Sequence, residues 1–161
     1  ENDRFLRAGG LGYVGVHAAF TCRDETLEAA ADLARSHGVG VHIHVAEGES
    51  DVTAADRLRP LSSTDWLVIH GVHLPDDHGL QGTIVHNPRS NMNNGVGYAR
   101  PTRFLNAVAL GTDGIGAAML DEFRLLVEGG YGTPPAPIDP AVARAVELLS
   151  IDLPALEEIA Q

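Results

Sequence analysis

The stretch VHIHVAE, residues 41–47, decides how this chain can be interpreted. Every second residue is apolar, at Val41, Ile43 and Val45. His42 and His44 occupy the alternate positions, and a period of two is typical of a β-strand whose faces differ. Glu47 follows just past the strand end. A histidine and a carboxylate delivered together by one strand indicate metal-assisted hydrolysis.

The strand pattern recurs on both sides of this stretch. Strands are predicted over residues 12–20, 39–47, 65–74, 82–88 and 106–114. Residues 21–37 carry apolar side chains at helical spacing, and a weaker helix is predicted over 49–59. Helical segments between apolar strands favour βαβ units, with strands buried on both faces of a parallel sheet. The predicted fold class is therefore α/β.

Polar side chains lie at or near the carboxyl ends of the predicted strands. They are His17, His44, His70, His86 and Asp113. The gaps between them are 27, 26, 16 and 27 residues, and three of these gaps match one βα unit. The gap of 16 leaves too few residues for an ordinary crossover helix, so this unit is predicted to be abbreviated. The five side chains are expected to meet at one rim.

Composition excludes several classes of protein. The chain has 161 residues, of which 44% are hydrophobic, which suffices for one packed domain. It carries 22 acidic and 11 basic residues with no basic stripe, so nucleic acid is not an expected partner. No apolar run is long enough for a membrane span. The single cysteine, Cys22, excludes an internal disulfide and favours a cytoplasmic location.

Four motifs then stand in an order that resembles the amidohydrolase superfamily. They are HVAE at 44–47, HGVHL at 70–74, HNPRSN at 86–91 and LGTDG at 110–114. The resemblance runs from about Gly12 to about Leu126. It is strongest to the aminohydrolase/chlorohydrolase branch, which includes guanine and cytosine deaminases and the SsnA-like aminohydrolases. It implies a metal-dependent (β/α)8 barrel, of which this chain supplies about strands 4 to 8.

The same resemblance implies a role for each polar residue. His44 and Asp113 are implied ligands of one divalent ion, most simply zinc, although iron, manganese and nickel also suit such ligands. Glu47, His70 and Asp113 are the implied catalytic residues, with Glu47 transferring protons and His70 beside the metal-bound water. His17 is implied to contact substrate. His86 either lines the same pocket or supports the loop that follows it.

The implied reaction is hydrolytic deamination, or dechlorination, of a nitrogen heterocycle by metal-activated water. The expected partner is accordingly a small molecule, with no membrane or nucleic acid. Sheet edges without a neighbouring strand can pair with a second copy of the chain, so a homo-oligomer stays among the expected partners. Among the remaining histidines, His42 and His73 are predicted to be packing groups, and His37 and His78 are predicted to lie on the surface.

One departure from the superfamily shapes the expected domain organisation. Its first strand supplies two ligands as His-x-His, and no such pair precedes His17. The chain is therefore expected to be the carboxyl-terminal part of a larger enzyme and inactive alone. Residues 1–130 are predicted to be barrel, 131–140 a linker and 141–161 a helical extension that is cut short. The alternative is a non-catalytic half-barrel or metal-binding module, using His42, His44 and Asp113, that associates with a partner chain.

Overall fold

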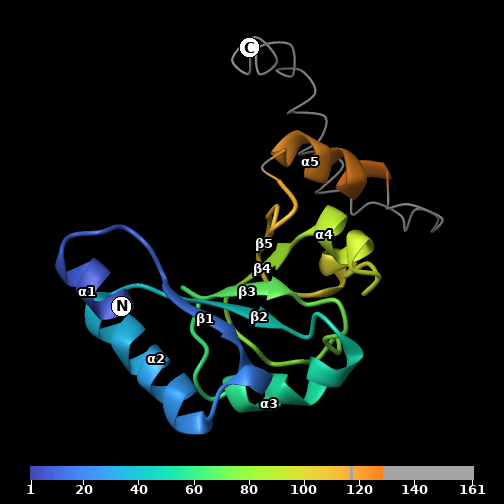
Figure 1. Ribbon diagram of the computed structural model, residues 1–161. Helices are drawn as coiled ribbons and strands as arrows, with labels where there is room; N and C mark the ends of the chain where they lie inside the picture. The colour runs from blue at the N-terminus through green and yellow to red at the C-terminus, as the bar shows by residue number, and fades with distance from the viewer. Residues whose placement is uncertain (117, 129–161) are drawn as a thin grey trace, which may run out of the picture.

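The computed structural model describes residues 1–116 and 118–128 and contains one five-stranded sheet (Figure 1). The strands are β1 (Val14–Ala18), β2 (Val41–Val45), β3 (Leu67–His70), β4 (Thr83–His86) and β5 (Val108–Leu110). They are hydrogen bonded in chain order, and every neighbouring pair is parallel. Each predicted strand range contains one of these strands, which confirms the α/β prediction. The observed strands are shorter because flanking residues form the connecting turns.

Helices occupy most of the connections between strands. The α-helices are α1 (Asn2–Arg7), α2 (Asp24–His37), α3 (Ala55–Leu58), α4 (Pro88–Asn93) and α5 (Met119–Glu128). Short 3-10 helices are η1 (Ala19–Thr21), η2 (Glu49–Ala54) and η3 (Pro101–Arg103). Helix α2 ends where predicted, because Gly38 adopts a left-handed φ of 66° that caps it. The weak helix predicted over 49–59 is η2 followed directly by α3.

One face of the sheet packs on helices α2 and α3, which lie together on the same side of it (Figure 1). Leu27, Ala31 and Ala34 of α2 and Leu58 of α3 are buried in this core. From the sheet, the alternate residues of β2 join them, at Val41, Ile43 and Val45. Each fully buried aliphatic side chain contributes about 1.5–3 kcal/mol. Because residues alternate along a strand, His42 and His44 face away from this core.

The connection from β3 to β4 contains no helix, as the spacing predicts. Gly82 in this connection has a φ of 114°, and a Cβ there would lie 2.6 Å from the Trp66 carbonyl oxygen. The connection also buries His78, whose Nδ1 accepts the Leu80 N–H at 3.0 Å. Its ring packs edge-on against Phe104 at 4.9 Å. The prediction that His78 is a surface residue was wrong, because the loop folds inward to bury that ring.

Two further predictions concern the remainder of the chain. The linker predicted over 131–140 and the helical extension over 141–161 lie outside the described residues. Among the described helices, none combines the length and apolar character needed to cross a membrane.

Candidate metal and catalytic site

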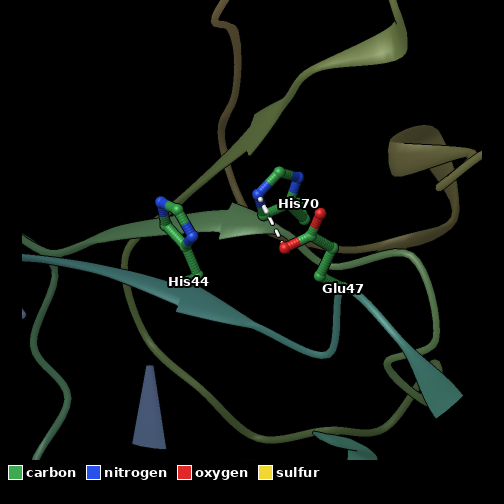
Figure 2. A group of neighbouring side chains, drawn as sticks. All are labelled: His44, Glu47 and His70. Atoms are coloured by element: carbon green, nitrogen blue, oxygen red, sulfur yellow. Dashed lines mark ion pairs between the residues drawn. The ribbon is translucent and has the colours of Figure 1, made fainter. Parts of the chain in front are cut away.

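Three polar side chains from neighbouring strand ends converge on one point (Figure 2). They are His44 near the end of β2, Glu47 just beyond it and His70 at the end of β3. One ligand atom from each lies within 4.8 Å of the others. The His44 and His70 rings meet edge-on with centroids 4.9 Å apart, and His70 Nε2 lies 3.5 Å from Glu47 Oε2. The parallel sheet thus brings together three of the residues that the sequence analysis selected.

His70 is completely buried, and its ring lies at this point (Figure 2). Its φ of 72° is in the left-handed region, which histidine adopts more readily than most residues other than glycine. On one side of the ring, Nδ1 lies 2.7 Å from Asn91 Oδ1. On the other side, Nε2 has no hydrogen-bond partner among the described residues. A buried ring nitrogen without a hydrogen-bond partner is suited to contact with a bound metal ion or another ligand.

Glu47 is positioned by an unusual turn that sequence reasoning missed. Ala46 has a φ of 47°, and its N–H donates to Asp51 Oδ2 at 2.7 Å. Asp51 is only 3% exposed, and burial raises the pKa of its carboxyl above the ordinary value. Asn94 Nδ2 donates to Glu47 Oε1 at 3.2 Å. In the sequence, the only feature that pointed to Asp51 was that it is an acidic residue four positions after Glu47.

Asp113 reaches the site from the residues after β5, with a φ of 49° and an exposed side chain. The Ser90 hydroxyl donates to Asp113 Oδ2. This bond, helped by the nearby His70 and His44, holds the pKa of Asp113 below its ordinary value, although burial opposes the shift. Asp113 is not one of the three residues whose ligand atoms meet within 4.8 Å. Its pairing with His44 as a metal ligand stays a prediction.

His44 has neighbours that favour its neutral form. Burial, and next the nearby His70, lower the pKa of His44 below the ordinary 6.5. A neutral imidazole has the lone pair that a metal ion needs. His17 lies beside it on β1, with ring centroids 5.5 Å apart, and is exposed. His17 is therefore accessible to a small molecule approaching His44, and its predicted substrate contact remains untested.

His86 has no exposed surface and packs edge-on against Tyr98 at 4.6 Å. Neither ring nitrogen has a hydrogen-bond partner within the described part of the chain. Burial lowers the pKa of His86 to about 4. Of the two roles that the sequence left open, this environment favours support of the loop, and substrate contact stays a prediction.

This burial predicts a stability effect at acid pH. The unfolded chain protonates His86 near pH 6.5, whereas the folded chain does so only near pH 4. The unfolded state therefore binds more protons between these values, and stability is lost as the pH falls. The loss is about 3 kcal/mol at most. The free energy of unfolding, measured in urea between pH 7.5 and 4, should show most of this loss removed in His86→Leu. Ile84→Leu should keep the wild-type dependence of that free energy on pH. Parallel profiles for wild type and His86→Leu would contradict this prediction.

The donor set at the strand ends fits a divalent metal ion. Imidazole nitrogens and a carboxylate oxygen are ligands that zinc and related ions prefer. His44, Glu47 and His70 supply these atoms, and the His70 Nε2 lone pair has no partner among the residues described. The fit rests on these side chains alone and does not identify the ion.

Comparisons with known proteins show which family and which relatives this chain is similar to. The model of the amidohydrolase family matches residues 4–136. A 5-methylthioadenosine/S-adenosylhomocysteine deaminase of Shouchella clausii is 33% identical over 119 residues, which cover 62% of this chain and 27% of that enzyme. A 5'-deoxyadenosine deaminase of Methanosphaera stadtmanae is 34% identical over 121 residues, covering 63% and 28%. The chain thus spans under a third of the length of these relatives.

Two solved structures share the fold. An adenosine deaminase from Xanthomonas campestris with bound zinc has a TM-score of 0.56 at 22% identity, covering 68% of this chain and 30% of that one. A guanine deaminase from C. acetobutylicum with bound guanine has a TM-score of 0.54 at 16% identity, covering 83% and 50%. The parallel sheet is that of an amidohydrolase barrel, present here in part. Because the family model matches most of its length, this chain belongs to the amidohydrolase family.

Proposed function

We propose that this chain carries part of the active site of a metal-dependent deaminase, which hydrolyses a C–N bond of a nitrogen heterocycle. The observation that carries the proposal is the convergence of His44, Glu47 and His70 at neighbouring strand ends. The family match and the deaminase relatives support the same reaction class. The proposed substrate is an adenosine-type nucleoside, because the relatives are named for such compounds.

Each site residue has a proposed task. His44 and Asp113 would hold a divalent ion, most simply zinc, which when bound would supply an activated water for attack on the ring carbon. Glu47, held by Asn94 and partly exposed at 29% of its side chain, can accept a proton and pass it to the heterocycle. His70 offers Nε2 as an acceptor beside Glu47. His17, exposed next to His44, is the proposed substrate contact.

Ammonia release tests this function. The intact protein, with whatever its gene encodes on either side of these residues, is loaded with zinc and given adenosine, 5'-deoxyadenosine, 5-methylthioadenosine, S-adenosylhomocysteine and guanine. We expect ammonia from at least one adenosine-type compound. One molecule of ammonia should be released for each molecule of product in which oxygen has replaced the amino group. Zinc-loaded protein that releases no ammonia from any of the five would reject the proposal and favour the non-catalytic metal-binding alternative.

A further inference from the structure

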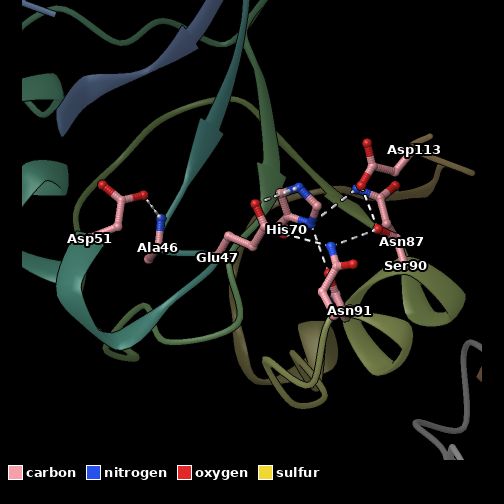
Figure 3. A network of polar contacts seen from close by, with 9 residues as sticks. Ala46, Glu47, Asp51, His70, Asn87, Ser90, Asn91 and Asp113 are labelled. Carbon is pink, nitrogen blue, oxygen red and sulfur yellow. Dashed lines mark hydrogen bonds and ion pairs between the residues drawn. The ribbon is translucent and has the colours of Figure 1, made fainter. Parts of the chain in front are cut away.

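Helix α4 and the residue that follows it contact all three strand ends of the site (Figure 3). Ser90 bonds Asp113 after β5, Asn91 contacts His70 at the end of β3, and Asn94 bonds Glu47 after β2. The residues that follow His86 were predicted to form a loop. The structure instead shows a helix, with Asn87 as its N-cap residue and Pro88 in its first turn.

The contact between Asn91 and His70 is the most buried of these. Both side chains are completely buried, and Asn91 Oδ1 lies 2.7 Å from His70 Nδ1. An amide oxygen can only accept a hydrogen bond, so Nδ1 must donate. Asn87 Nδ2, a competing donor, is farther from the same nitrogen at 3.4 Å. The shorter contact dominates, and the neutral ring then carries its proton on Nδ1 and a lone pair on Nε2.

The opposite side of the ring fits this assignment. The Nε2 lone pair lies 3.5 Å from Glu47 Oε2, another acceptor, and has no hydrogen-bond partner in the described ranges. Two acceptors that face each other repel one another unless a metal ion or a proton lies between them. His44 presents its ring to the same space. The arrangement is therefore suited to a positive ion.

We propose that Asn91 is a positioning residue, which selects the Nδ1–H form of His70 and so directs the Nε2 lone pair at the ion site. This rests on the proposed function only in that a metal ion is taken to bind beside His70. Metal-ligating histidines are commonly held by a hydrogen bond from their other nitrogen, and His70, which lies beside the ion site, is held in the same way. Here the acceptor is Asn91 Oδ1 on α4, which lies in the connection between β4 and β5. Metal affinity should therefore depend on α4 being folded.

Two substitutions of similar size separate hydrogen bonding from packing. Asn91→Asp keeps an acceptor oxygen facing Nδ1, whereas Asn91→Leu fills the space without one. Asn93→Leu, at an exposed position of the same helix, is the matched control. Zinc affinity is measured by competition with a chelator, and nitrogen NMR of the metal-free protein reports which nitrogen of His70 carries the proton. Circular dichroism shows whether each variant is folded.

The wild type and Asn91→Asp should show Nδ1–H, with zinc affinities within about threefold of each other. Asn91→Leu should lose the preference for Nδ1–H and bind zinc about 10–100-fold more weakly, and Asn93→Leu should match wild type. An Nε2–H ring in the wild type overturns the proposal, as does wild-type affinity in a folded Asn91→Leu protein. If Asn91→Leu does not fold, the wild-type proton position decides alone. Both readouts need no substrate, so absence of deamination would reject the proposed function and leave this inference intact.

Discussion

Replacing Glu47 with glutamine is expected to lower kcat of the intact protein by about 10²–10⁴-fold and to leave its metal content unchanged. This range is typical for loss of a general acid or base. Glutamine has the size of glutamate and keeps an oxygen for the Asn94 amide, so the local structure should persist. The turn fixed by the Asp51–Ala46 hydrogen bond does not involve the changed side chain. What disappears is the ability of residue 47 to carry a proton at neutral pH.

The measurement combines steady-state deamination with metal analysis of the same preparation. Glu49→Gln is the matched control, because Glu49 is an exposed carboxylate two residues away and belongs to no part of the site. Near-normal turnover in Glu47→Gln would remove Glu47 from proton transfer. Loss of the metal together with turnover would make Glu47 a ligand instead, an assignment that its closeness to His44 and His70 allows.

The fold was predictable because it depends on patterns that the sequence displays directly. In VHIHVAE, the period of two separates a core face from a histidine face, and the structure buries Val41, Ile43 and Val45 in the core. Parallel strands place their carboxyl ends at one edge, so residues at those ends could be grouped before any coordinates were known. This reasoning brought His44, Glu47 and His70 together.

What could not be predicted depends on backbone conformation and on distant contacts. Ala46, His70 and Asp113 all have positive φ values, and each lies in or beside the site. Such values are set by the surrounding structure, and the modest preference of histidine and aspartate for positive φ does not locate them in a sequence. Asp51 was missed for a related reason, since its buried carboxylate accepts the Ala46 N–H, a contact that depends on how the turn folds. Ser90 and Asn91 belong to helix α4, which Asn94 follows, and the turn-forming residues of this segment did not indicate a helix.

Replacing Asp113 with alanine is expected to weaken zinc retention by at least about 100-fold and to abolish turnover. Loss of a residue that only orients a ligand costs up to about 100-fold in affinity, and loss of a ligand should cost no less. Asp113 is suited to binding a cation, because the Ser90 hydroxyl and the nearby histidines keep its pKa low and its carboxylate charged. The measurement is zinc content after dialysis against a chelator, followed by the ammonia assay.

Asp113→Asn provides the control for folding in the same experiment. The residue at this position has a φ of 49°, which asparagine and aspartate adopt more readily than alanine. Asparagine also keeps an oxygen to accept the Ser90 hydroxyl. Both variants should lose zinc, because the charge is gone in each, while the free energy of unfolding should fall only in Asp113→Ala. If both variants kept zinc and turnover, Asp113 would not be a ligand, and the ion would have to depend on His44, Glu47 and His70, the three side chains that already converge.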